Sequence, residues 1–425
     1  MTTRFPYGKT FIVGFGFLSI SVLWPIFNSF IPIFLQAGNP EFERQLLEAG
    51  REIPQVTGFG LTPTLAFFVM TWDNIINVFV QPWAGAKSDK TWNRFGRRKP
   101  WILVGLPIAA LALVFIPLAN TVFAIMIFIL ITNFGMALFR SPTVAWLGDL
   151  FPTEQRSKAN GIINLMGGIG AAIALFGGGI LFDRLGRAAP FVAGSLIMIA
   201  MASIALRFVK EPKRIEVQDD TPESSIFDNF KTVFRAEDRS GFFVLLAILL
   251  WFMAYEALQT GLSSFAVFTL GLTPGKASIY TTLFAASFIL FALPSGLIAT
   301  KFGRRRTINI GLSGLVILFA GGFFLIREPI TFAVILVLGG ICWALVNVNS
   351  LPLVYDHGDE RKIGAYTGLY YFASQSAAVL GPVLSGALVD TLGDQYRWLW
   401  LFSATFMALA WFSMMRVTEK KPASI

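Results

Sequence analysis

Long apolar stretches alternate with short breaks along almost the whole chain, and the breaks hold most of the charged residues. A helix needs about 20 apolar residues to cross a bilayer, because it rises about 1.5 Å per residue. Twelve stretches reach that length, which predicts an all-α membrane protein of twelve transmembrane helices. The predicted spans are 10–36, 61–86, 100–119, 121–150, 158–182, 188–208, 240–270, 277–299, 306–326, 328–355, 363–389 and 396–416.

Two of the segments between these spans carry a pattern of their own. Residues 41–53, EFERQLLEAGREI, predict a short helix outside the membrane, with no role that the sequence reveals. In residues 224–240, SSIFDNFKTVFRAEDRS, two serines can cap a helix whose apolar residues share one face. We expect an interfacial helix there. It falls in a linker, 209–239, that joins a six-helix half (1–208) to a second one (240–425).

The composition favours lipid as the solvent of this chain and leaves little room for catalysis. Charged residues make up only 14% of it, against roughly a quarter in soluble proteins, and 55% is hydrophobic. One Cys (Cys342) and one His (His357) exclude a disulfide framework, a four-ligand metal site and a histidine-based triad. No nucleophile–base set is present. We therefore expect neither an enzyme nor a metal or other cofactor.

The net charge of +9 reflects the placement of Lys and Arg in the loops. Loops on the side of the N-terminus hold 26 of these residues, and loops on the opposite side hold 7. The positive-inside rule then predicts that both termini are cytoplasmic, in a multi-pass protein of a bacterial-type inner membrane. Because the membrane topology explains the excess of Lys and Arg, we expect the bilayer as a partner and do not expect a nucleic acid.

The two predicted halves repeat each other at one constant spacing. Gly96-Arg97-Arg98 recurs as Gly303-Arg304-Arg305, 207 residues later. Four further pairs share this offset: Asp149 and Asp356, Gly161 and Gly368, Asp183 and Asp390, Gly186 and Gly393. Two halves of equal topology are typical of transporters that work by alternating access.

Several motifs carry a resemblance to a known family. GAKSDKTWNRFGRR (85–98) resembles the loop between spans two and three of the major facilitator superfamily, and GLIATKFGRR (296–305) is a second copy without the acid. Asp149 followed by Arg156 resembles the signature of sugar-carrying members after span four. The longer runs GAKSDKTWNRFGRRKPW, FRSPTVAWLGDL and WALVNVNSLPLVYD are similar to the glycoside–pentoside–hexuronide:cation symporters and, more closely, to bacterial relatives of sucrose:proton symporters. The resemblance implies the twelve-helix major facilitator fold.

Asp89 stands alone among six cations at the predicted cytoplasmic end of span two. It can accept hydrogen bonds from Arg or from a helix N-terminus, and so latch the cytoplasmic ends of the halves while the cavity faces outward. The alternative is that the basic residues signal topology only. The predicted cytoplasmic gate comprises Gly85, Asp89, Arg94, Gly96, Arg97, Arg98, Asp149, Arg156, Arg304, Arg305, Asp356 and Arg361.

Three charged residues, Asp73, Arg140 and Glu256, lie well inside predicted spans. Each costs roughly 2.5–3.5 kcal/mol or more at the bilayer centre unless it faces protein or water, which makes function the default reading. A buried carboxyl group can hold a proton near neutral pH, so we expect proton coupling through Asp73, with Glu256 and Asp149 as the other candidates. The alternative is a permanent structural pair of Asp73 with Arg140.

Sodium coupling is less expected than proton coupling. The melibiose-type porters carry cation-binding acids on the face that Asp73 begins, where this chain has Asn77 and Gln81. Arg140 can bind sugar hydroxyls with its guanidinium group or balance an anionic substrate. The other candidate substrate-binding residues are polar or aromatic: Asn28, Trp72, Asn77, Gln81, Asn133, Tyr255, Gln259, Asn347, Asn349, Tyr370 and Gln375. Each could equally be hydrogen-bonded between helices.

The sequence thus predicts a monomeric major facilitator that takes up a glycoside such as sucrose or maltose together with protons. A second hypothesis keeps the same transporter fold and changes the substrate to an organic anion, a polyamine or a drug-like solute, with antiport possible. A third hypothesis is a sensor that does not transport, which the complete gate motif in the first half argues against.

Overall fold

The computed structural model describes residues 5–212, 239–357 and 363–418. Within them, twelve helices are long and apolar enough to cross a membrane, which confirms the predicted all-α architecture. The predicted interfacial helix lies outside the described residues. The spans agree with the predicted ranges to within a few residues at each end.

The helices of the first half are α1 (Tyr7–Gln36), α2 (Pro40–Glu48), α3 (Pro63–Met70), α4 (Trp72–Lys90), α5 (Lys99–Phe115), η1 (Ile116–Leu118), α6 (Val122–Leu150), α7 (Thr153–Ala172), η2 (Ile173–Gly177), α8 (Gly178–Leu185) and α9 (Ala189–Phe208). Those of the second half are α11 (Ser240–Phe268), α12 (Pro274–Phe302), α13 (Arg304–Leu325), α14 (Pro329–His357), α15 (Ile363–Thr391) and α16 (Arg397–Met415).

Two spans of the first half are interrupted. The second span divides into α3 and α4 at Thr71, whose hydroxyl donates to the carbonyl of Phe68 at 2.7 Å. The fifth span runs through α7, the π-helical turn η2 and α8. Both α3 and η2 contact the other half of the molecule. Turns of this kind inside long helices occur frequently at functional sites.

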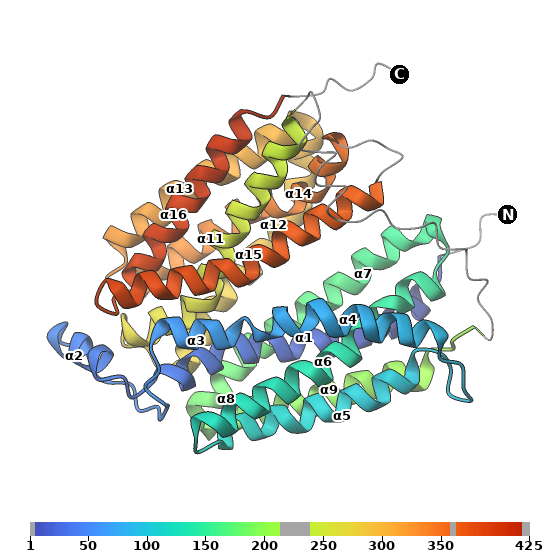
Figure 1. The fold of residues 1–425 in the computed structure, drawn as a ribbon, viewed down its shortest axis with the longest axis horizontal. Helices are drawn as coiled ribbons and strands as arrows, with labels where there is room; N and C mark the ends of the chain where they lie inside the picture. The colour runs from blue at the N-terminus through green and yellow to red at the C-terminus, as the bar shows by residue number, and fades with distance from the viewer. Residues whose placement is uncertain (1–4, 213–238, 358–362, 419–425) are drawn as a thin grey trace.

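The two halves meet at one end and diverge at the other. Figure 1 shows the bundles close together near α2 and spread apart toward the end that carries both termini. We call these the α2 end and the termini end. At the α2 end α3 packs on α15 and α8 packs on α12, whereas α4 and α7 make little contact with those partners. A solute between the halves therefore meets closed packing on the side of α2.

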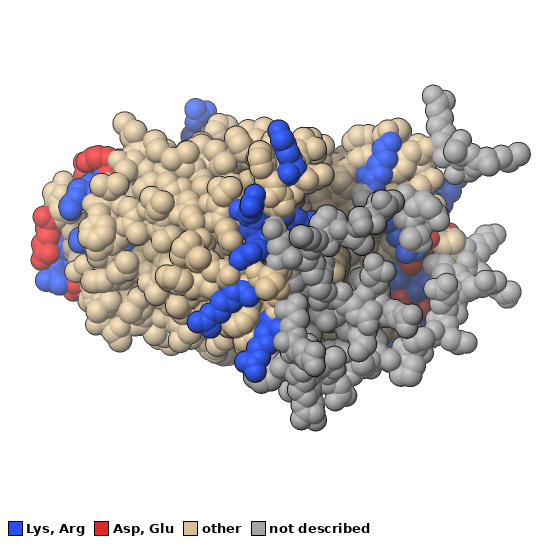
Figure 2. Space-filling view, turned by 90° about the horizontal axis from the view of Figure 1, so that it is seen from above, with Lys and Arg blue, Asp and Glu red and all other residues tan. Residues whose placement is uncertain are grey.

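The surface has the polarity expected of a membrane protein. Acidic side chains gather at the α2 end together with Lys and Arg, further Lys and Arg lie toward the termini end, and much of the surface between is uncharged (Figure 2). Large apolar side chains such as Leu293 and Phe79 are exposed. Soluble proteins rarely expose so much contiguous apolar surface, and contact with lipid tails removes its cost.

The short helix predicted outside the membrane is α2. Asn39 caps it by accepting a hydrogen bond from the amide of Glu41 at 2.9 Å. Phe42, which is buried, stacks on Phe268 of α11 with the ring centres 4.7 Å apart. Gln45 donates to the carbonyl of Gly393 at 2.7 Å. The helix therefore belongs to the first half in sequence and packs on the second half in space.

Glu211, directly after α9, fixes the start of α5. Its carboxylate accepts hydrogen bonds from the backbone amides of Arg97, of Arg98 at 2.9 Å and of Lys99 at 3.0 Å. The indole of Trp146 donates to it as well, at 2.8 Å. The first amides of a helix have no partner inside the helix, so this carboxylate satisfies those of Arg98 and Lys99, and it complements the helix dipole. The contact ties the last helix of the first half to the charged loop before α5.

Replacing this carboxylate tests the assignment. We expect Glu211→Ala to lower the thermal midpoint of the purified protein by several degrees, because losing a helix-capping acceptor costs about 0.5–2 kcal/mol. Glu211→Gln should recover part of the loss, since an amide oxygen still accepts hydrogen bonds. Glu52→Ala, at an exposed acid of the α2 end, serves as the control. Equal midpoints for Glu211→Ala and Glu52→Ala would contradict the capping role.

Candidate functional site

A cavity of about 790 Å³ lies between the two halves, within the size range of small-molecule sites. Its walls come from α1, α7 and η2 of the first half and from α11, α12 and α14 of the second. The polar and large aromatic residues that line it are Phe17, Ser21, Trp24, Asn28, Ser29, Asn164, Tyr255, Gln259, Ser263, Thr281, Phe284, Phe288, Trp343 and Asn347. All of the described residues lining this cavity are uncharged.

Three of its walls present the same pair of side chains. An aromatic residue is followed four positions later by an amide, as Trp24 and Asn28 on α1, Tyr255 and Gln259 on α11, and Trp343 and Asn347 on α14. Residues four apart share one face of a helix, so each ring lies beside its amide along the wall. The cavity therefore combines flat apolar surfaces with amide donors and acceptors.

Two of the aromatic rings already form a platform. The phenol of Tyr255 stacks on the indole of Trp343 with ring centres 4.3 Å apart and ring planes at 5°. Trp343 also contacts Phe252 edge to face, with centres 5.7 Å apart. These contacts bind α11 to α14 and hold the platform in place.

Four predicted binding residues, Asn28, Tyr255, Gln259 and Asn347, line the cavity. The prediction omitted the other polar and aromatic residues that line it, among them Trp24, Asn164, Ser263 and Trp343. Two of the omitted residues carried a signal. Trp24 and Trp343 stand four positions before predicted amides, and the helical period alone places them on the same faces.

Other predicted binding residues have partners inside the protein or lie elsewhere. Asn349 is buried and donates to the hydroxyl of Ser295 and to the carbonyl of Leu345, each at 3.0 Å. The hydroxyl of Tyr370 lies 3.2 Å from that of Ser350. These contacts match the alternative of hydrogen bonding between and within helices. Outside the cavity walls, Trp72 is part-buried and meets Phe68 edge to face, while Gln375 is exposed.

The three charged residues of the spans form one group across the halves. Asp73 on α4 lies within electrostatic range of Arg140 on α6 and of Glu256 on α11. Tyr371 on α15 acts on Arg140 as well. Asp73 and Glu256 are part-buried, whereas Arg140 is exposed beside them. Acids of both halves and one cation therefore share a field that changes whenever the halves move.

Buried polar atoms without a hydrogen-bond partner among the described residues occur on α4 and α6, the helices of Asp73 and Arg140. One carboxylate oxygen of Asp73 and the amide oxygen of Asn77 are buried without a hydrogen-bond partner among the described residues. Both amide atoms of Asn133 on α6 are in the same condition. Gln81, one turn beyond Asn77, is part-buried. Buried polar groups are nearly always hydrogen-bonded, so these atoms are poised for a proton, a solute or water.

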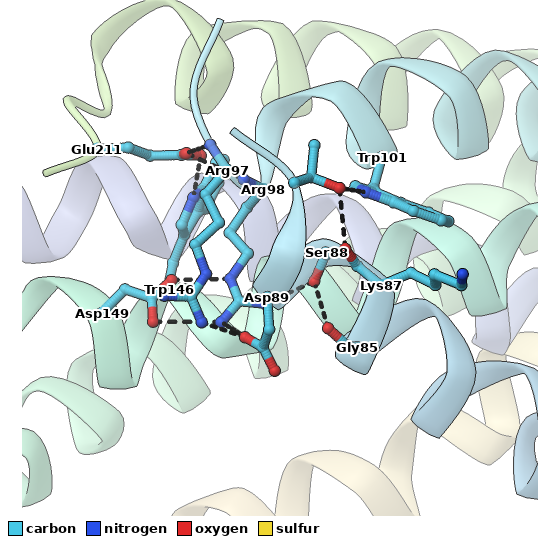
Figure 3. Close-up of polar contacts among 11 residues, drawn as sticks. Gly85, Lys87, Ser88, Asp89, Arg97, Arg98, Trp101, Trp146, Asp149 and Glu211 are labelled. Carbon is cyan, nitrogen blue, oxygen red and sulfur yellow. Dashed lines mark hydrogen bonds and ion pairs between the residues drawn. The ribbon is translucent and has the colours of Figure 1, made fainter. Parts of the chain in front are cut away.

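The predicted gate motif forms a charge network at the termini end (Figure 3). Asp89 forms ion pairs with Arg97 and with Arg98. Arg98, only 4% exposed, also donates to both oxygens of Asp149, at 2.8 Å and 3.3 Å, and to the hydroxyl of Ser88 at 2.5 Å. All of these residues belong to the first half. The latch between the halves concerns the opposite conformation and stays a prediction.

Other gate residues of the first half form contacts within that half. Gly96 has φ 118° in the turn before α5, and a Cβ there would lie 2.3 Å from a carboxylate oxygen of Glu211. The carbonyl of Gly85 accepts from Ser88 at 2.7 Å. Arg156 donates to the carbonyls of Phe151 and Gly148, at 3.0 Å each.

In the second half the motif residues have different partners. Arg305 donates to the carbonyl of Met415 at 2.9 Å, where a cation stabilises the C-terminus of α16. Arg304 begins α13. In the first half, Arg94 lies over the ring of Phe95 at 4.7 Å. The side chain of Asp356 and all of Arg361 lie outside the described residues.

Relatives of this chain carry different solutes. It is 25% identical to a hexuronate transporter of Bacillus subtilis over 65% of this chain and 69% of that protein. It is 25% identical to multidrug resistance protein 2 of the same organism over 88% and 86%. It is 22% identical to the class B tetracycline resistance protein of Escherichia coli over 79% and 82%. These relatives support transport and leave the solute open.

Solved structures share the fold. The nucleoside transporter NupG superposes with a TM-score of 0.70 at 16% identity, covering 97% of this chain and 100% of that chain. A bacterial homologue of the lysosomal transporter Spinster, in an inward-facing and occupied conformation, gives 0.67 at 15% identity over 98% of each chain. The sequence model of the Major Facilitator Superfamily matches residues 10–280 and 262–424. This chain therefore belongs to the Major Facilitator Superfamily of membrane transporters.

Proposed function

We propose that this protein is a proton-coupled symporter of a neutral, hydroxyl-rich ring compound, a sugar or glycoside such as sucrose or maltose. The proposal rests above all on the cavity between the halves, whose walls alternate aromatic rings with amides and hold no charge among the described residues. The sequence motifs that resemble those of glycoside porters agree with it.

The chemistry of the walls selects neutral solutes. A sugar ring has apolar faces that rest on aromatic rings and hydroxyl groups that both donate and accept hydrogen bonds. An amide offers both a donor group and an acceptor, so Asn28, Gln259 and Asn347 can match hydroxyls of either direction. A carboxylate or an ammonium group in this cavity would lose its hydration without gaining a counter-charge from the walls.

The charged group beside the cavity supplies the coupling. A lone carboxyl group in a low-dielectric site exchanges a proton according to the charges around it, and Asp73 faces both a cation and a second acid. Rocking of the halves changes the distances from Asp73 and Arg140 to Glu256, because the acids belong to different halves. One proton moving down 100 mV releases about 2.3 kcal/mol, which can drive uptake against a gradient.

The orientation follows from the loop charges. We place the basic termini end in the cytoplasm of a cell whose inner membrane holds the protein, with both termini inside. The α2 end then faces outward, and the spread of the halves toward the termini corresponds to an inward-facing state. Transport would exchange this state with one in which the charge network around Asp89 bridges the halves.

A second candidate is an organic anion, and Arg140 is the observation that favours it. This cation is exposed beside Asp73 near mid-membrane, where it could meet an anionic group. One relative is a hexuronate transporter. The neutral solute remains the better match because Arg140 lies outside the lining of the large cavity and shares the field of Asp73.

A binding panel on the purified protein separates the two candidates. We expect a neutral mono- or disaccharide to bind, without competition from a hexuronate, at both pH 6 and pH 8. Gln259→Leu and Asn347→Leu should each raise the sugar Kd about tenfold, because a substrate hydroxyl loses its partner. Asn120→Leu, at an exposed amide outside the cavity, should leave it unchanged. Binding of the hexuronate alone, and its loss in Arg140→Gln, would favour the second candidate.

The coupling role of Asp73 is tested by separating uphill from downhill transport. In proteoliposomes, we expect Asp73→Asn to abolish sugar accumulation driven by a pH gradient and to retain counterflow exchange, which needs no net proton movement. Glu52→Gln, at an exposed acid, should keep both activities. Full uphill accumulation by Asp73→Asn would reject this residue, and loss of coupling in Glu256→Gln alone would transfer the role to α11.

A further inference from the structure

Two aspartates that the internal repeat relates to each other meet helix starts of the opposite half at the α2 end. Asp390, at the end of α15, accepts hydrogen bonds from the amide of Thr64, at 3.2 Å, and from its hydroxyl. Thr64 is the second residue of α3, and its amide has no partner within that helix. A carboxylate of the second half therefore caps a helix of the first half.

The same contact occurs in the reverse direction between α8 and α12. Asp183, in the last turn of α8, accepts hydrogen bonds from the amide of Gly275 at 3.1 Å and from the hydroxyl of Thr273 at 2.7 Å. Gly275 is the second residue of α12. Both capped helices begin with Thr-Pro, at 62–63 and at 273–274.

The helices cross closely at both contacts because a glycine precedes each aspartate by one turn. A Cβ on Gly179 would lie 2.5 Å from the carbonyl oxygen of Gly275, a distance that real Cβ atoms do not reach. A Cβ on Gly386 would lie 2.9 Å from the carbonyl oxygen of Pro63. Gly179-x-x-x-Asp183 and Gly386-x-x-x-Asp390 are thus two copies of one crossing, with the aspartate as cap and the glycine as contact.

We propose that Asp183 and Asp390 are positioning residues of transport, which hold the α2 end closed by capping α12 and α3 across the interface between the halves. The inference rests on the proposed function in taking the α2 end as the outer face that must open for loading. Each carboxylate complements the positive end of a helix dipole of the other half. When the halves part at this end, both helices lose the carboxylate and keep only the N-capping hydroxyl oxygen of Thr62 or of Thr273. The closed state therefore carries two matched interactions that the outward-facing state lacks.

The state of the α2 end can be measured without any solute. In a Cys342→Ser background, spin labels at Asn120 and Glu328, exposed in loops of opposite halves, report the separation of the halves in nanodiscs. We expect Asp183→Ala and Asp390→Ala each to shift the ratio of open to closed distances about tenfold toward open, the usual cost of a lost cap. The two factors should multiply to about a hundredfold in the double variant, because free-energy changes at separate sites add.

Matched variants distinguish a lost cap from general damage. Asp183→Asn and Asp390→Asn should return most of the closed population, because Asn caps helices nearly as well as Asp. Gly386→Ala should open the same end without removing a carboxylate, and Glu52→Gln should change nothing. Two results would overturn the inference. One is an unchanged distance distribution in the double Ala variant, and the other is opening in Gly386→Ala while the Ala variants of both aspartates stay closed. If no sugar bound in the binding panel, the spin-label measurement would still stand, because it uses no solute.

Discussion

Carboxylates that cap helix starts connect the elements of this protein at both ends. The first amides of a helix have no partner inside the helix, so an acceptor from elsewhere in the chain stabilises a helix start. Glu211 provides it for α5 within the first half, and Asp183 and Asp390 provide it for α12 and α3 across the halves. The first contact joins the segment after α9 to the start of α5 within one half. The other two make the arrangement of the halves dependent on a few hydrogen bonds.

The charged residues of the spans lie outside the solute cavity, and this separation bears on how solute and proton are coupled. The cavity holds rings and amides, which bind a neutral solute without dominating the electrostatics. The acids and Arg140 stand beside it, where their interaction depends on the position of the halves. A solute can bridge the walls of both halves, and a proton can change the field beside them. Both therefore act on the same movement of the halves. This is what coupling requires, because each ligand can bias the shared equilibrium only through its preference for one state.

The two halves keep the internal repeat at sites where both need the same geometry, and they differ from each other at sites where their chemistry differs. Glycine and aspartate recur at both crossings of the α2 end, since both need close approach and a cap. At the termini end the second copy of the gate motif lacks the acid of the first, and Arg305 binds carbonyls of α16 instead. The charged group of the spans is likewise asymmetric, with Asp73 and Arg140 from one half and Glu256 from the other. Symmetric scaffolding thus carries an asymmetric site.

The sequence by itself determined the twelve spans, their duplication and the family, because span length and loop charge are local properties that a bilayer enforces. It also placed Asn28, Tyr255, Gln259 and Asn347 among the candidates for the cavity, where the structure has them. It could not rank them above Asn349, because spans that are apolar all round give no sign of which face turns inward.

Only the tertiary structure decided the partners of residues far apart in the chain. Asp183 was visible as a landmark of the repeat, but its contact with Gly275 depends on how the two halves pack. Glu211 carried no signal at all, since its amide partners lie more than 100 positions earlier. Long-range hydrogen bonds depend on packing, and packing is what the apolar pattern of a membrane helix leaves undetermined.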